Sequence, residues 1–354
     1  MCKMKILVDA MSGDNAPLEI IKGASLAAKE YAEHTIILVG DENIISDTAV
    51  KNDIDIKGID IIPSETVISM EDNPICVVRD KKNSSMGVGL KTLANGTVDA
   101  FVSAGNTGAL ITGATIIVRR IPGINRAGIA SVLPLTNPVL LMDSGANLNV
   151  SSDNICQFGY MGAKYMEKIY GIDRPRVGLL NNGTEYNKGN QLQVESYQIL
   201  SDSGLNFVGN VEGKEVPFDV CDVVVADGFT GNIFLKTCEG MGKFLMKTLK
   251  DVLTTNIATQ LSALTMKEKT KELKHKFDAS EHGGAPLLGI SKPVIKAHGS
   301  SDSNAIKNAV RQAIHFVETG IIKDIIDFAE EYDEKKILDS ADKALSTSTE
   351  DIEI

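Results

Sequence analysis

The feature that most constrains the fold of this sequence is a repeated alternation of short apolar runs with helix-length amphipathic segments. The short runs are rich in β-branched residues and are predicted to be buried strands. They are Ile6–Val8, Ile36–Val39, Ile59–Ile62, Ala100–Ser103, Val139–Met142, Val177–Leu180, Phe207–Val208, Val223–Ala226 and Val294–Lys296. The predicted helices between them are 17–33, 84–95, 106–120, 152–170, 190–202, 230–264 and 303–320. This alternation predicts an α/β fold with a mostly parallel sheet and helices on both faces.

The chain is expected to form one continuous architecture. Its 354 residues, 43% apolar and 23% charged, are enough for a sizeable core, and the first 300 positions contain neither a repeat nor a low-complexity linker. We expect a single domain over 1–335, with a helical arm at about 239–277 inserted in it, and an acidic tail over 336–354. No apolar run approaches the ~18 residues of a spanning helix, and the N-terminus lacks a leader pattern, so a cytoplasmic protein is expected.

Charge is segregated along the chain. The net charge of −11 argues against nucleic acid as a partner. Residues 318–354 hold twelve acids and four lysines, a balance of −8, whereas residues 243–276 hold eight lysines and three acids, a balance of +5. An acidic C-terminus and a basic arm are therefore predicted to coexist.

The five cysteines form no CxxC pair, which indicates neither a zinc site nor a disulfide framework. No metal site and no cofactor is therefore predicted. The chain also lacks GxxxxGK[ST], and its nearest approach to GxGxxG, at Gly87–Thr92, has no third glycine and follows no strand. The standard nucleotide-binding folds are disfavoured.

Six loops that follow predicted strands share a composition of Gly, Asn, Asp, Ser and Thr. They are Asp9–Asn15, Ser103–Gly108, Asp143–Asn147, Asn181–Glu185, Asp227–Asn232 and His298–Asn304. Any one of them alone is more readily explained as ordinary turn and capping residues. Because ligands of open α/β sheets bind at the carboxyl ends of the strands, six together predict a polar cleft suited to an anion.

Two residues in these loops are the best candidates for chemistry. His298 is the one histidine that directly follows a strand inside a Gly/Ser loop, and an acid/base role competes with that of a structural histidine. Lys188 lies between two polar, glycine-containing segments, and we favour it over Lys81 and Lys82 for contact with a ligand.

The basic arm carries an approximate helical stripe of leucines around an uncharged stretch at 252–266. One interpretation is a helix packed in the core or against a second subunit. The other is a projecting helical hairpin whose tip, near 254–264, adsorbs to an anionic membrane or whose lysines dock an acidic protein. The residues assigned to this contact are Leu261, Leu264, Lys267 and Lys271.

The polar loops, taken in order, resemble the signature blocks of the bacterial acyl-ACP:phosphate acyltransferase family (PlsX). The blocks are Asp9–Pro17, Lys81–Met86, Ser103–Ala109, Asn182–Glu185, Asp227–Asn232 and Lys296–Asp302. The resemblance implies a three-layer α/β/α sandwich with a Rossmann-like, mostly parallel sheet, similar to phosphotransacetylases and isocitrate dehydrogenase. It also implies a homodimer. Ser12 departs from the glycine usual in the first block, where the backbone geometry is the feature affected.

The implied reaction is attack of inorganic phosphate on the thioester of a long-chain acyl group carried by acyl carrier protein, giving acyl phosphate for phospholipid synthesis. Lys188 and His298 are the predicted catalytic residues. The predicted phosphate- and acyl-binding residues are Asp9, Asn106, Thr107, Asn147, Asn182, Thr184, Glu185, Asp227, Thr230, Asn232, Ser300 and Ser301. The alternatives are a phosphotransacetylase-like enzyme that uses acyl-CoA, and a non-enzymatic acyl-phosphate-binding scaffold at the inner face of the membrane.

Overall fold

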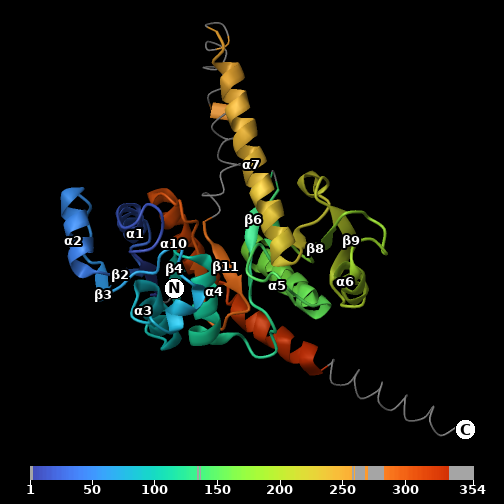
Figure 1. Cartoon of the computed structure of the whole chain (residues 1–354), viewed down its shortest axis with the longest axis horizontal. Coiled ribbons are helices and arrows are strands. Elements are labelled where there is room, and N and C mark those ends of the chain that lie inside the picture. Colours follow the sequence, from blue (N-terminus) through green and yellow to red (C-terminus); the bar gives the residue numbers. More distant parts are fainter. Residues whose placement is uncertain are drawn as a thin grey trace, which may run out of the picture.

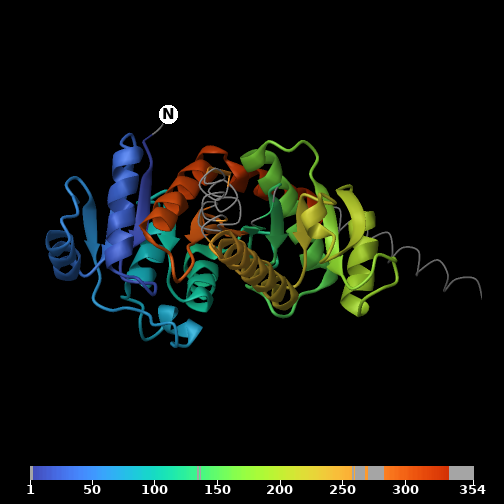
Figure 2. The same ribbon diagram turned by 90° about the horizontal axis from the view of Figure 1, so that it is seen from above.

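The structure, a computed structural model, describes residues 3–133, 135, 137–256, 259, 268–269 and 283–334. These residues form two sheets side by side (Figures 1 and 2). The first has the order β3-β2-β1-β4-β12-β11-β5 and the second the order β6-β7-β10-β8-β9. The first comprises β1 (Lys5–Asp9), β2 (Thr35–Gly40), β3 (Asp60–Pro63), β4 (Ala100–Ser103), β5 (Gly128–Ile129), β11 (Ala285–Leu288) and β12 (Val294–Lys296). The second comprises β6 (Ser131–Leu133), β7 (Val139–Met142), β8 (Arg176–Asn181), β9 (Asn206–Glu212) and β10 (Val223–Val225).

The pairing is mostly parallel, as the sequence predicts. The exceptions are β11, which is antiparallel to both neighbours, and β6, which is antiparallel to β7. All nine predicted strands are present. The single expected sheet is in fact divided in two, and the sequence analysis missed β5, β6 and β11, because these short antiparallel strands carry no long apolar run.

Helices cover both faces of the first sheet. Alternate residues of β1 point to opposite sides: Ile6 and Val8 pack with α1 (Leu18–Glu30) and α10 (Ser303–Glu318), whereas Leu7 packs with α3 (Ser85–Ala94) and α4 (Thr107–Gly113). The chain also forms α2 (Glu42–Lys51), η1 (Pro74–Val78) and the π-helix η2 (Ala114–Arg119), which continues α4. This half has the three layers expected of an α/β/α sandwich.

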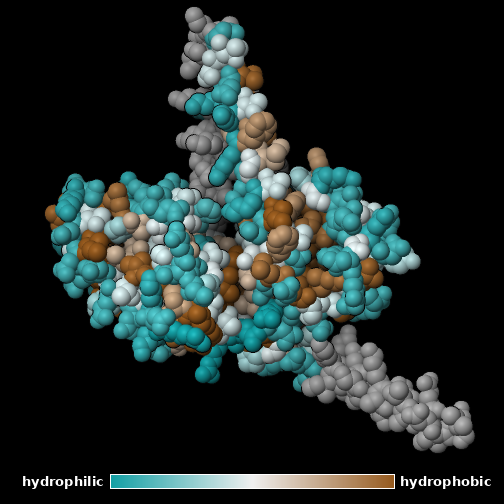
Figure 3. All heavy atoms as spheres, in the orientation of Figure 1, coloured by the Kyte–Doolittle hydropathy of each residue, from teal (hydrophilic) through white to brown (hydrophobic). Residues whose placement is uncertain are grey.

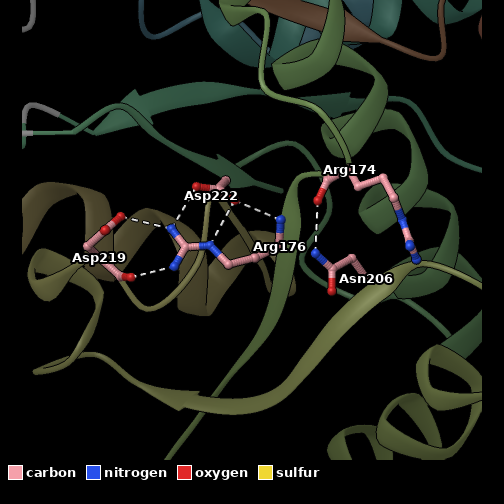
Figure 4. A network of polar contacts seen from close by, with 5 residues as sticks. All are labelled: Arg174, Arg176, Asn206, Asp219 and Asp222. Atoms are coloured by element: carbon pink, nitrogen blue, oxygen red, sulfur yellow. Dashed lines mark hydrogen bonds and ion pairs between the residues drawn. The ribbon is translucent and has the colours of Figure 1, made fainter.

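The second sheet is covered by α5 (Ser152–Tyr170), α6 (Gln191–Ser201) and a helix over 321–334. Its other face packs against η3 (Val216–Phe218) and the first turns of α7 (Gly228–Leu253). At the amino ends of the strands, Arg176 donates to Asp222 (Nε to Oδ2, 3.0 Å) and to Asp219 (Nη2 to Oδ1, 2.8 Å) (Figure 4). This network ties β8 to the start of β10 at the edge opposite the polar loops.

Helix α7 leaves the body of the molecule and projects from it (Figure 1). Only Gly228 and Gly231 of its 26 residues are buried, and large apolar side chains lie exposed along it (Figure 3). It begins two residues before the predicted helix and ends at Leu253. The assigned contact residues Leu261, Leu264, Lys267 and Lys271, and the predicted tail 336–354, lie outside the described residues. Within the described chain, no helix combines the length and apolarity needed to cross a bilayer.

Candidate functional site

A cavity of about 850 Å³ lies where the carboxyl ends of β4 and β12 face the start of α7. Its volume is in the range of small-molecule sites. The half of the molecule that holds the seven-stranded sheet contributes Asp14, Met70, Gly105, Thr107, Lys296, His298, Gly299, Ser300, Ser301, Asp302 and Ala305, among others. The remainder of the wall includes Ile129, Ser131, Val132, Ser144, Gly145, Asn232, Leu235, Lys236, Glu239, Lys243 and Met246. The cavity is thus lined by polar and cationic side chains together with apolar ones such as Leu235 and Met246.

Three helices begin around this cavity, and an Asn or Asp side chain caps each of them. Asn106 Oδ1 accepts from Ala109 N of α4 at 3.0 Å, and Asp302 Oδ1 accepts from Ala305 N of α10 at 2.8 Å. Asp227 Oδ1 accepts from Thr230 N of α7 at 2.9 Å, and Asp227 Oδ2 accepts from the Thr230 hydroxyl at 2.7 Å. Asn106, Asp227 and Thr230 therefore hold helix starts in place, and they do not line the cavity.

Two fully buried carboxylates build the loops beneath the cavity. Asp9, at the end of β1, accepts from the Ser103 hydroxyl at 2.8 Å. Asp143, after β7, accepts from four backbone N–H groups at 2.7–3.2 Å and from Asn147 Nδ2 at 2.9 Å. Burial raises the pKa of both carboxyls. Asp9 and Asn147 thus position loops and are not part of the cavity wall.

The Asp143 loop and the start of α7 are in direct contact. Gly228 N donates to Asn147 O at 2.8 Å. A Cβ atom at Gly231 would overlap the carbonyl oxygen of Asp143, so this close approach requires glycine. The contact brings Asn232, one residue on, to the cavity wall.

His298 lies in the cavity with both ring nitrogens engaged. Its Nδ1 is 2.8 Å from the Ser300 hydroxyl oxygen, and its Nε2 is 3.4 Å from Lys236 Nζ. Partial burial, followed by the Lys236 cation, lowers the pKa of the imidazole from its usual value. The ring is therefore mainly neutral near pH 7 and able to accept a proton.

Lysines supply the positive charge of the cavity. Lys236 pairs with Glu239 at 2.9 Å, and Lys296 Nζ donates to the carbonyl oxygen of Ala297. Burial lowers the pKa of Lys296 to about 8, so that its charge is lost just above neutral pH. Lys243 lines the same cavity about one turn beyond Glu239. Together with the starts of α7 and α10, these lysines form an environment suited to an anion.

Lys188 lies elsewhere. It follows β8, its side chain is half exposed, and its Nζ is 3.8 Å from Glu185 Oε1. Asn182, Thr184 and Glu185 in the same loop are exposed, and none of these four residues lines the cavity. Of the predicted site residues, the structure brings together Thr107, Asn232, His298, Ser300 and Ser301.

Lys236, Lys243 and Lys296 line the cavity but were not among the predicted site residues. The first two share a helix face with Asn232, at spacings of four and eleven residues, a signal that becomes readable once α7 is known to begin at Asp227. Lys296 is the last residue of β12, where the carboxyl-edge argument itself applies. Among the described residues, no three His, Cys, Asp or Glu side chains form a group able to hold a metal ion.

The chain is similar to a known protein family, to several named enzymes and to solved structures. Residues 4–324 match the model of a family described as "Fatty acid synthesis protein". The phosphate acyltransferase of Thermoanaerobacter pseudethanolicus is 46% identical over 91% of this chain and 96% of its own length. That of Bacillus licheniformis is 45% identical over 90% and 96%. Among solved structures, a phosphotransacetylase from Streptococcus pyogenes matches with a TM-score of 0.57 at 18% identity, over 91% of this chain and 94% of its own. The EutD phosphotransacetylase from Staphylococcus aureus matches with a TM-score of 0.56 at 16% identity, over 90% of this chain and 94% of its own. These two structures share the fold.

Proposed function

This chain belongs to the fatty acid synthesis protein family of phosphate acyltransferases, and from that premise we propose that it transfers a long-chain acyl group from acyl carrier protein to inorganic phosphate. The observation that carries the proposal is a cavity in which His298 and three lysines lie together with apolar side chains. Phosphate suits the lysines, and an acyl chain suits apolar residues such as Leu235 and Met246. The acyl phosphate product would serve phospholipid synthesis.

The reaction needs little covalent help from the protein. An oxygen of hydrogen phosphate attacks the thioester carbonyl carbon, a tetrahedral intermediate forms, and the carbon–sulfur bond breaks to release the carrier as a thiol. The proton that phosphate loses is the proton that the leaving thiolate gains. A neutral His298 suits both transfers, because it accepts the proton from phosphate and then donates it to sulfur.

Phosphate would be held by Lys236 and Lys296, with N–H and hydroxyl groups from Thr107, Ser300 and Ser301 completing its hydrogen bonds. Asn232 lies one turn before Lys236 on the same face of α7 and suits the developing oxyanion. Donors aimed at such an oxyanion are worth about 3–4 kcal/mol each in other acyl-transfer sites. Lys188 lies outside the cavity, so a catalytic role for it would require its loop to approach the site; Lys188→Ala tests that role.

The acyl donor separates this proposal from its nearest alternative. The phosphotransacetylase fold of the solved neighbours favours acyl-CoA as a second candidate donor. We favour the carrier protein because α7 projects from the body of the molecule and carries Lys247 and Lys250 after the cavity-lining Lys243, where an acidic protein would meet them. A scaffold without catalysis would not require the reactive histidine and lysines to converge.

We also propose a homodimer that acts in the cytoplasm, in peripheral contact with an anionic membrane. Exposed apolar side chains on α7, such as Phe244 and Leu245, support a protein or lipid partner for this helix. Light scattering at micromolar concentration tests the dimer. Sedimentation with anionic vesicles tests the membrane contact, and Leu261→Glu combined with Leu264→Glu should release the protein from them.

The decisive experiment mixes purified protein, long-chain acyl-ACP and phosphate, and traps acyl phosphate with hydroxylamine. We expect product that depends on phosphate, with acyl-CoA of equal chain length used less well. EDTA should leave the rate unchanged. Loss of activity with EDTA, or thioester hydrolysis as the sole reaction, would contradict the proposal.

A further inference from the structure

We propose that Met70 determines the choice between phosphate and water in this enzyme by covering the reacting thioester, an inference that rests on the proposed function. Met70 belongs to a segment between β3 and η1, residues 65–73, which we call the strap. Its side chain lines the cavity and is also 47% exposed, so it stands at the cavity rim. No role in the reaction steps above uses this residue.

One buried side chain fastens the strap to the site. Asn106 Nδ2 contacts three strap carbonyl oxygens, those of Ser69 at 3.2 Å, Met70 at 3.0 Å and Asp72 at 3.2 Å. The same residue caps α4, whose first residue, Thr107, lines the cavity. The strap and the phosphate-facing start of α4 are therefore fixed to each other through one amide.

An ion pair fastens the strap from outside. Lys81 Nζ lies 2.5 Å from Asp72 Oδ2 and 3.1 Å from Val67 O, while Asp72 Oδ2 also accepts from Ser69 N at 2.7 Å. The Lys81 ammonium holds the pKa of Asp72 below its usual value. Strap residues on both sides of Met70 are thereby anchored.

The anchored strap directs Met70 toward the loop that carries the histidine. A Cβ atom built on Gly299 would lie 3.2 Å from Met70 Cε, and Gly299 stands between His298 and Ser300. The methionine methyl group thus reaches the backbone beside the proposed base. A flexible, apolar side chain in this position can follow the surface of a bound acyl thioester and exclude solvent from it.

The chemistry makes such a cover necessary. Water is far more concentrated than phosphate and can attack the same carbonyl carbon, forming a carbon–oxygen bond, breaking the carbon–sulfur bond and giving free fatty acid and thiol. Closed active sites suppress such side reactions by excluding water. Phosphate is retained by the lysines, so a rim group that keeps bulk water out favours acyl phosphate over fatty acid.

The test measures the ratio of free fatty acid to trapped acyl phosphate formed from acyl-ACP. Met70→Ala should raise this ratio by about tenfold with little change in the KM for phosphate, and Met70→Leu should restore the low ratio. Lys81→Met should raise it in the same direction because the strap loses its ion pair. Lys214→Met is the matched control, because it breaks a 2.6 Å ion pair with Glu212 that lies away from the cavity. This variant should leave the ratio of free fatty acid to acyl phosphate unchanged.

The outcomes separate the two proposals. A wild-type protein that makes no acyl phosphate refutes the proposed function. A wild-type protein that makes it, with Met70→Ala giving the wild-type ratio, overturns the role of Met70. A third outcome is that Met70→Ala raises the ratio, whereas Lys81→Met leaves both the ratio and the melting temperature unchanged. That result would show that the ion pair of the strap is not what holds Met70 in place.

Discussion

Two polar loops with a candidate catalytic residue in each behave differently in this molecule. Residues 298–304 follow β12 and are rich in Ser, whereas residues 181–190 follow β8 and are rich in Asn and Gly. The first loop lines the cavity, whereas the second places Lys188 half exposed beside Glu185. Composition therefore identifies a loop at the carboxyl edge of a sheet, and the strand's place in the sheet order decides whether the loop reaches the site.

The largest effect is expected at His298. His298→Ala should lower kcat/KM by at least ~10²-fold, because a proton relay is lost, with less than about 1 kcal/mol change in the free energy of unfolding. Steady-state kinetics measure the change in kcat/KM, and thermal melting measures the change in stability. His315→Ala, on the exposed side of α10, is the control and should retain full activity. Near-normal turnover in His298→Ala would remove the cavity loop from the mechanism.

The second prediction concerns the Asp143 loop, which shows that the five-stranded half also reaches the cavity. Asp143→Asn should lower the free energy of unfolding by about 2 kcal/mol, because an amide NH₂ replaces an oxygen that accepts backbone N–H groups. Asp227→Asn, the same change at an ordinary helix cap, should cost only a few tenths. Equal melting temperatures for the two variants would show that Asp143 is no more than a cap.

A smaller effect is expected at Lys296. Lys296→Met should raise the KM for phosphate by about tenfold at pH 7. Because burial lowers the pKa of this lysine to about 8, the wild-type KM should rise as pH passes 8, and the variant should lack that rise. Lys292→Met, before the other end of β12, should leave the KM unchanged. An identical pH profile in Lys296→Met would show that another group binds phosphate.

The smallest effect is expected at the loop outside the cavity. Lys188→Ala should change kcat/KM by less than about threefold, because the half-exposed side chain lies beside Glu185 and does not line the cavity. A loss as large as that of His298→Ala would instead show that the two loops come together in the working enzyme. That result would restore Lys188 to the catalytic role that the sequence assigns to it.

The parallel strands and their helices were predictable because each strand is a short apolar run and each helix an amphipathic segment. The runs at 6–8 and 223–226 are strands buried on both faces, and the helix over 152–170 was predicted to the residue. The division into two sheets was not predictable, because it depends on short antiparallel pairs such as β11 with β5. Their partners are far apart in sequence, and no local pattern marks them.

For the site, the sequence identified the correct sheet edge but not the direction of each side chain. Asn106 and Asp227 belong to polar loops, yet their oxygens are used by backbone N–H groups of their own helices. Lys236 lies two turns into α7, beyond the polar segment Asp227–Asn232. Whether a polar group caps a helix or faces a ligand depends on the packing of neighbouring elements.

The contact between Gly231 and Asp143 also limits how this protein can change by inheritance. Even the smallest side chain at position 231 would push the Asp143 loop away from α7, so a substitution there requires a compensating shift in the loop. The exposed positions farther along α7 have no such packing restriction. The first turn of the helix is therefore fixed by the fold itself, whereas its far part is constrained by whatever partner it meets.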